Sequence, residues 1–174
     1  MKNLKVNTIY VDTKSKVLNY GGLSFSCVIG KEGVTSHKKE GDLKTPLGIF
    51  QVREVFYRKD RLGNGIDTKL PLLEIHQDFG WCDDPQSSLY NKFIENRSLF
   101  TCSHERLWRQ DRLYNIVVVL GYNDAPAVPG NGSAIFLHAA RPTMTPTHGC
   151  IALAQDDLIR LLKELPRNCY IDIS

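Results

Sequence analysis

The residues best suited to chemistry lie in one stretch of the C-terminal part of the chain. His138 comes at the end of an apolar run, and a short loop with two prolines separates it from His148-Gly149-Cys150, which another apolar run follows. A thiol becomes an acyl acceptor when it is partly exposed, has an imidazole to take its proton, and faces N–H groups that stabilise the developing oxyanion. A strand-end histidine, a Gly-Cys turn and a connecting loop can supply all three. The spacing therefore predicts a cysteine–histidine acyl-transfer enzyme.

The same block resembles the active-site signature of the YkuD-type L,D-transpeptidases, which cross-link bacterial peptidoglycan. Thr147-His148-Gly149-Cys150, with His138 upstream, is similar to the Ser/Thr-His-Gly-Cys block of that family and its preceding histidine. A second patch, Lys-Thr-Pro-Leu-Gly-Ile-Phe at 44–50, is similar to the Thr-Pro-x-Gly-x-Phe segment that the family places before a sheet strand. The resemblance implies a mainly β, sandwich- or barrel-like catalytic domain with a short C-terminal helix, and 1–174 as a single domain.

The resemblance also implies the roles of the site residues. Cys150 is the expected nucleophile and His138 its base, with the imidazole oriented by a backbone carbonyl rather than by a carboxylate. The backbone N–H groups of Gly149 and Cys150 are the expected oxyanion donors. His148 either donates to the substrate or braces the loop, and Thr147 either bonds within the site or shapes the turn. No metal, nucleotide or organic cofactor is implied.

Three departures from the family pattern concern the substrate pocket. Ala139 follows the upstream histidine where the family usually has glycine, and Ala152 stands where it usually has arginine. The loop between His138 and Cys150 is also shorter than typical members carry. Arg141 is the candidate to supply the missing guanidinium.

A second unusual cluster is Trp81-Cys82-Asp83-Asp84, followed by a proline. Two carboxylates beside an indole could bind the cationic end of a diamino acid, which peptidoglycan stems carry. The alternative is an Asp-Pro turn with a half-buried tryptophan, since Asp before Pro is common in turns.

The function implied is a peptidoglycan L,D-transpeptidase that forms stem-peptide cross-links through a cysteinyl thioester, with stem peptides as donor and acceptor. One alternative is an L,D-carboxypeptidase or endopeptidase, in which water resolves the same thioester. A non-catalytic wall-binding module, or a metal-binding protein built on His138, His148 and Cys150, are further alternatives.

Composition agrees with one ordinary catalytic domain. The chain has 174 residues, 42% of them hydrophobic and 24% charged, which are globular averages. The net charge of +3 is mild and is not gathered into a stripe, so nucleic acid is not an expected partner. No apolar run reaches the length of a membrane span. The substrate predicts a periplasmic or cell-envelope location, although residues 1–7 show no signal-peptide pattern.

The five cysteines form no C-x-x-C pair, which disfavours structural zinc and a disulfide framework. Cys27 and Cys169 lie in apolar runs and are expected to be buried. Cys150 is expected to be the most reactive thiol, because it alone has a predicted imidazole partner.

Hydrophobic periodicity predicts a chain of strands with one helix. The polar segments 30–45 and 78–112 are predicted to be loop or irregular, and the charged pairs and runs at Lys38-Lys39 and 58–61 are predicted to face solvent. A helix is predicted at Asp156–Leu165, because leucines recur at helical spacing and Pro166 stops it. The predicted strands are 5–11, 17–20, 23–29, 48–57, 72–77, 114–122 and 135–139.

Overall fold

The computed structural model describes residues 7–63 and 65–174. Its main element is a nine-stranded sheet in the order β11-β12-β13-β3-β2-β1-β14-β6-β7. Strand β11 also pairs with β6, so the sheet closes on itself, and β7 extends it from β6 outside the ring. The strands are β1 (Thr8–Asp12), β2 (Val17–Tyr20), β3 (Leu23–Val28), β6 (Gly48–Tyr57), β7 (Leu72–Glu74), β11 (Ile116–Leu120), β12 (Phe136–Ala139), β13 (Ile151–Leu153) and β14 (Tyr170–Ile173).

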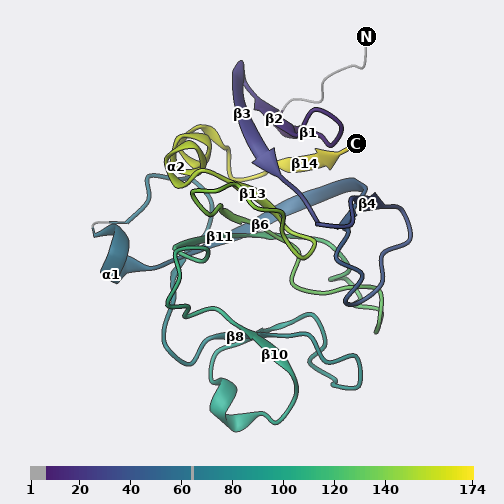
Figure 1. Cartoon of the computed structure of the whole chain (residues 1–174). Helices are drawn as coiled ribbons and strands as arrows, with labels where there is room; N and C mark the ends of the chain where they lie inside the picture. The colour runs from purple at the N-terminus through teal and green to yellow at the C-terminus, as the bar shows by residue number, and fades with distance from the viewer. Residues whose placement is uncertain (1–6, 64) are drawn as a thin grey trace.

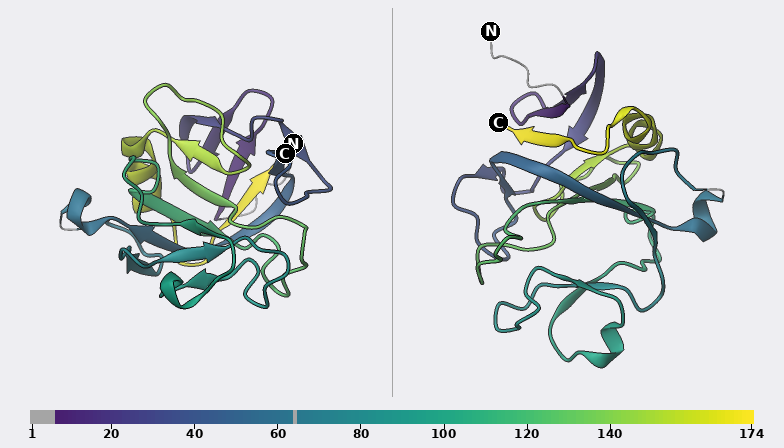
Figure 2. Two further views of the ribbon diagram at one scale, coloured as in Figure 1. Left: turned by 60° about the horizontal axis from the view of Figure 1, so that its bottom comes forward. Right: turned by 180° about the vertical axis from the view of Figure 1, so that it is seen from behind.

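Smaller elements lie outside this closed sheet. A three-stranded sheet in the order β10-β8-β9 forms a separate layer, seen below the main sheet in Figure 1 and again from behind in Figure 2. Its elements are β8 (Gly80–Cys82), β9 (Phe93–Ile94), the 3₁₀ helix η1 (Arg97–Leu99) and β10 (His104–Arg106). The remaining elements are the pair β4 (Val34–Thr35) and β5 (Thr45–Pro46), and the helices α1 (Lys59–Leu62) and α2 (Gln155–Glu164).

Strand β11 separates two hydrophobic clusters. All five of its side chains are buried, and successive residues of a strand point to opposite faces. Ile116, Val118 and Leu120 therefore join the core inside the closed sheet, where α2 also packs through its leucines. Val117 and Val119 join a second cluster, which lies toward the small sheet and includes Phe136 of β12.

The mainly β fold with a short C-terminal helix is confirmed. Strands β2 and β6 and helix α2 lie within one residue of their predicted bounds. The predicted strand at 5–11 begins at Thr8, and its first two residues lie outside the described part of the chain. Strand β7 ends three residues earlier than predicted, at Glu74.

The prediction that 78–112 is irregular is wrong in part, since it contains three strands of two or three residues and η1. Strands this short show no periodicity over a sequence window, and only pairing across the chain reveals them. The prediction that the charged runs face solvent is also wrong for two residues. Lys38 is 8% exposed and Arg58 is 4% exposed, because each forms an ion pair, with Asp42 and Asp60 respectively.

Within the described residues, neither helix has the length and apolar character needed to cross a membrane.

Candidate active site

Parallel pairing of β12 with β13 brings the two predicted catalytic residues to one side of the sheet. The register aligns His138 with Ala152, so Cys150, which directly precedes β13, lies beside Phe136. Side chains two apart along a strand share a face, and Phe136 belongs to the cluster toward the small sheet. The Cys150 and His138 side chains therefore share this face, and both line a cavity of about 450 Å³.

A backbone carbonyl fixes the tautomer of His138. Its Nδ1 lies 2.8 Å from the Ala139 oxygen, and a carbonyl can only accept a hydrogen bond. Nδ1 therefore carries the proton, and Nε2 keeps the lone pair that a general base needs. The ring is 5% exposed and meets the Tyr114 ring edge-on, with centroids 5.4 Å apart. Burial lowers the pKa of His138 to about 4, so the imidazole is neutral at pH 7.

The Cys150 thiol is also neutral in the resting site. Its Sγ donates to the Ala134 carbonyl at 3.2 Å and accepts from the Phe136 N–H at 3.4 Å. Burial raises the pKa of Cys150 to about 12, and the Phe136 N–H opposes that rise because it favours the thiolate. The residue is nonetheless partly exposed, at the cavity wall. Thiol and imidazole thus rest as an uncharged pair.

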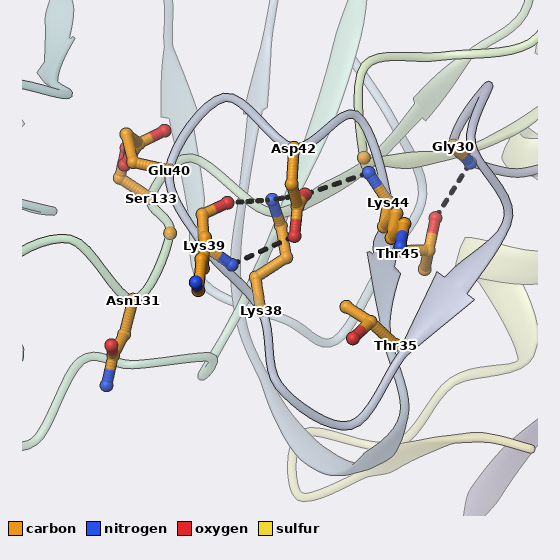
Figure 3. A network of polar contacts seen from close by, with 12 residues as sticks. Gly30, Thr35, Lys38, Lys39, Glu40, Asp42, Lys44, Thr45, Asn131 and Ser133 are labelled. Carbon is orange, nitrogen blue, oxygen red and sulfur yellow. Dashed lines mark hydrogen bonds and ion pairs between the residues drawn. The ribbon is translucent and has the colours of Figure 1, made fainter.

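Two threonines hydrogen-bond to the backbone carbonyl of Cys150. The Thr147 hydroxyl donates to the Cys150 carbonyl at 2.6 Å, and the Thr45 hydroxyl donates to the same oxygen at 3.4 Å. Thr45 in turn accepts the Gly30 N–H at 2.8 Å, as Figure 3 shows. The two sequence patches, 44–50 and 147–150, therefore meet at the nucleophile.

The turn at Gly149 requires glycine. Its φ is +138°, and an added Cβ would lie 3.0 Å from the Lys44 carbonyl oxygen. Its N–H donates to the Thr147 hydroxyl at 3.1 Å, so in the resting site this predicted oxyanion donor is already engaged. Thr147 thus bonds within the site, through both its hydroxyl and its backbone, which pairs with Gly30 as an isolated bridge.

A buried ion pair supports this turn from below. Lys38 Nζ lies 2.5 Å from Asp42 Oδ1, and its side chain is 4% exposed. Asp42 also accepts the backbone N–H groups of Lys39 and Lys44, as the dashed lines of Figure 3 show. The Lys38 chain passes 3.6 Å from the place where a Gly149 Cβ would be. The loop that contains Lys38, Asp42 and Lys44 therefore packs against the turn that carries the nucleophile.

Three cavity residues carried no functional signal in the sequence. Glu105, Arg109 and Tyr114 line the same cavity as His148 and Cys150. Arg109 pairs with Glu105 at 2.9 Å and with Asp111 at 2.7 Å, and its guanidinium lies 5.0 Å from the centre of the Tyr114 ring. Burial raises the pKa of Tyr114 well above its usual value, and Glu105 adds to that rise. Glu105 lies in β10, Arg109 and Tyr114 follow that strand, and no local sequence pattern marks the three residues.

The remaining predicted residues divide into two groups. Arg141 and His148 are exposed and line the cavity, so both can reach a bound substrate. Trp81 is 7% exposed, donates through Nε1 to Asn91 at 2.8 Å, and packs edge-on against Phe136. Asp83 and Asp84 are half-buried, and neither is among the residues that line this cavity. Asp84 accepts the Gln86 N–H, which is the bonding of an Asp-Pro turn.

Solved structures of similar shape include two L,D-transpeptidases and a cell-shape protein. L,D-transpeptidase 1 of Mycobacterium tuberculosis is 12% identical with a TM-score of 0.43, covering 95% of this chain and 57% of that one. The L,D-transpeptidase of Mycobacterium smegmatis is 14% identical with a TM-score of 0.43, covering 96% and 58%. The helical cell shape determining protein Pgp2 of Campylobacter jejuni is 14% identical with a TM-score of 0.47, covering 96% and 46%.

This chain thus spans about half the length of these three proteins. No curated protein sequence matches it. A family model described as YkuD, the L,D-transpeptidase catalytic domain, matches residues 6–173, which is nearly the whole chain. The protein therefore belongs to the YkuD family of L,D-transpeptidase catalytic domains.

Proposed function

We propose that this protein is a cysteine-dependent L,D-transpeptidase that acts on peptidoglycan stem peptides in the cell envelope. The observation that carries the proposal is the pinned tautomer of His138. Its Nδ1–H is held by the Ala139 carbonyl, which leaves Nε2 as a base on the face of the sheet that Cys150 shares. A general base beside a thiol in one cavity is the arrangement that nucleophilic acyl transfer needs.

The proposed reaction has two half-reactions. In the first, the Cys150 sulfur attacks a stem-peptide carbonyl while His138 Nε2 takes the thiol proton. The resulting imidazolium then protonates the leaving amine, and a thioester remains on Cys150. In the second, an amine from another stem attacks the thioester, and His138 takes the proton of that amine and returns it to the sulfur. Water in place of the amine would give hydrolysis.

The neutral resting pair has a mechanistic consequence. With the pKa of Cys150 raised to about 12 and that of His138 lowered to about 4, a thiolate–imidazolium pair is unfavourable before substrate binds. Proton transfer is therefore expected to accompany the attack of sulfur on the carbonyl. The sulfur must also leave the Ala134 carbonyl, to which it donates in the resting site.

The charges around the cavity suit a substrate with both signs of charge. Glu105 has a carboxylate, which Arg109 partly neutralises, and Arg141, in the loop after β12, has an exposed guanidinium. A stem peptide carries free amino and carboxylate groups. We assign Arg141 to the substrate carboxylate and Glu105 to the substrate ammonium. Asp83 and Asp84 remain a proposed second contact outside the cavity, and Trp81, which is buried and bonded to Asn91, would support that contact from within the fold.

The test is incubation of the purified protein with stem-peptide muropeptides, with and without an amine acceptor, followed by mass spectrometry. Cys150→Ala and His138→Ala should each lower turnover by roughly 10³-fold or more, and the double variant should be little worse than either. A carbapenem should add its mass to wild type and not to Cys150→Ala. Cys102→Ser, assayed under reducing conditions, is the matched control that removes a different half-buried thiol.

The products decide between the candidate activities. Cross-linked products support transpeptidation, whereas trimmed stems alone would establish a carboxypeptidase or endopeptidase. Turnover by Cys150→Ala at a rate near wild type would overturn the mechanism. Binding to muropeptides without any turnover by wild type would indicate a wall-binding module instead. Recovery of the native protein in the cytoplasmic fraction alone would contradict the envelope location.

A further inference from the structure

Two cysteines outside the active site face each other in the small sheet. The Sγ atoms of Cys82 and Cys102 are 3.5 Å apart. Cys82 lies in β8 and is fully buried, whereas Cys102 comes two residues before β10 and is partly exposed. The register aligns His104 with Cys82, so Cys102 is the diagonal neighbour of Cys82 across an antiparallel pair.

Hydrogen bonds hold both backbones in place. Cys82 donates its N–H to Lys92 at 2.9 Å, and its carbonyl accepts the Asn91 N–H at 2.9 Å. On the other strand, the His104 ring donates through Nδ1 to the Cys102 carbonyl at 2.8 Å. Cys82 is thus fixed within the sheet, and the backbone of Cys102 is held by the adjoining His104. Formation of the bond shortens the distance between the two sulfurs from 3.5 Å to a covalent S–S distance of about 2.05 Å.

The other three cysteines, all described by the structure, are placed elsewhere. Cys27 and Cys169 belong to the core inside the closed sheet. The Cys150 sulfur is held between Ala134 and Phe136 in the active-site cavity. Cys82 and Cys102 are therefore each other's thiol partner.

We propose that Cys82 and Cys102 form an intramolecular disulfide by exchange with a disulfide-bonded oxidant such as glutathione disulfide. This inference does not depend on the proposed catalytic function. The Cys102 thiolate attacks one sulfur of the oxidant, forming a mixed disulfide and releasing one oxidant thiol. Cys82 then attacks Cys102 Sγ, forming the protein disulfide and releasing the second oxidant thiol. The protons of the two cysteines end on the two released thiols, and the oxidant takes up both electrons.

Exposure sets the order of these two attacks. Burial raises the pKa of the Cys82 thiol, and the neighbouring Cys102 adds to the rise. Cys102 is the sulfur that an oxidant in solution can reach. Cys82 becomes a nucleophile only toward the mixed disulfide next to it, where the attack is intramolecular.

The disulfide would cross-link the three-stranded sheet, which contributes residues to the active-site cavity. It closes the loop of residues 83–101, which contains β9 and η1. Trp81, next to Cys82 in β8, packs against Phe136, which is the neighbour of Cys150 across the strand pair. Glu105, three residues after Cys102, lines the active-site cavity. Cross-linking a loop of this length lowers the entropy of the unfolded chain, which corresponds to a melting temperature roughly 5–10 °C higher in the oxidised protein.

The experiment uses the full-length protein purified under reducing conditions and then freed of reductant. Glutathione disulfide is added, the remaining thiols are alkylated, and the unreduced protein is digested for peptide mass mapping. We expect one cross-linked peptide pair that contains Cys82 and Cys102 and is two hydrogens lighter than the reduced pair. The melting temperature should rise and should return to its starting value on addition of dithiothreitol.

Three variants make the result specific. Cys102→Ser, at a partly exposed position, should leave the reduced melting temperature unchanged and abolish both the cross-link and the shift. Cys150→Ala should keep both, because its sulfur belongs to a different site. Cys82→Ala should stop the reaction at a stable mixed disulfide on Cys102. Oxidised wild type in which Cys82 stays free for alkylation after denaturation, or in which Cys102 is joined to Cys150, would overturn the proposal.

Discussion

At the scale of single residues, the local environments of Cys150 and His138 determine their resting charges. Burial raises the pKa of the thiol to about 12 and lowers that of the imidazole to about 4. Both pKa shifts favour the uncharged forms, so the proton stays on the Cys150 thiol and does not pass to His138 before substrate binds. The Ala139 and Ala134 carbonyls, which accept the imidazole N–H and the thiol, suit this neutral state.

The first prediction concerns the reactivity of Cys150 in the free enzyme. Between pH 6 and 10, its rate of alkylation by iodoacetamide should rise about tenfold per pH unit, because the thiolate fraction rises that way below the pKa. Measurement requires peptide mapping of the label at each pH. At pH 7, Cys102, which is partly exposed, should be labelled before Cys150. This revises the expectation from the sequence that Cys150 is the most reactive thiol, because burial raises the pKa of Cys150 to about 12.

A plateau of Cys150 alkylation that begins below pH 7 would contradict the neutral pair and establish a thiolate–imidazolium pair. Cys27 and Cys169 serve as internal references, because burial raises the pKa of each to about 11. Their rates should stay low until the protein unfolds.

At the scale of elements, the turn between β12 and β13 depends on glycine. Gly149 has a φ of +138°, in a region that side chains rarely adopt, and a Cβ there would press on the Lys44 carbonyl. Lys44 itself is held through its N–H by Asp42, which the buried Lys38 pairs with. The loop at 30–45 has little freedom to move aside.

The second prediction is that Gly149→Ala lowers the free energy of unfolding by about 2 kcal/mol and kcat/KM by more than tenfold. Urea denaturation and muropeptide turnover measure the two effects. Gly22→Ala is the matched control, since Gly22 has a φ of +85° but nothing within 4 Å of an added Cβ. It should cost about 1 kcal/mol and leave activity intact. Equal costs for the two variants would show that the Lys44 contact is unimportant.

At the scale of the whole molecule, one buried amide joins the small sheet to the closed sheet. Asn91 accepts from Trp81 Nε1 at 2.8 Å and from the Ala134 N–H at 3.1 Å. Its amide group donates to the carbonyls of Tyr122 and Asn123 at 2.9 and 2.7 Å. The residue is 5% exposed, and each of the four hydrogen bonds of its side chain reaches another segment of the chain. It therefore places Ala134, whose carbonyl accepts the Cys150 thiol.

The third prediction is that Asn91→Asp lowers the free energy of unfolding by about 3 kcal/mol. The change keeps the size of the side chain but removes both donors and leaves two carbonyls facing a carboxylate. Chemical denaturation at pH 7 measures the cost. Asn131→Asp is the matched control on an exposed side chain and should stay within about 0.5 kcal/mol of wild type. A cost for Asn91→Asp no larger than for this control would show that the amide does not hold the two layers together.

Local sequence patterns determined the elements that carry the nucleophile and base. The apolar runs that end at His138 and begin after Cys150 are β12 and β13, and the leucine spacing at 156–165 is α2. Burial of Cys27 and Cys169 is also confirmed. Such patterns predict elements well because a strand or helix buries one face, and the residues on that face recur at a regular spacing along the sequence.

Only the tertiary structure decided what surrounds the two catalytic candidates. Glu105, Arg109 and Tyr114 reach the cavity because the small sheet folds back onto the face of β12, which no local period encodes. Lys38 is buried because Asp42 offers an ion pair in the same loop, although its neighbours in the sequence are polar. The neutral state of Cys150 and His138 likewise follows from burial by distant segments. Sequence spacing identifies which groups can react, whereas the closure of the chain around them sets their charge and their partners.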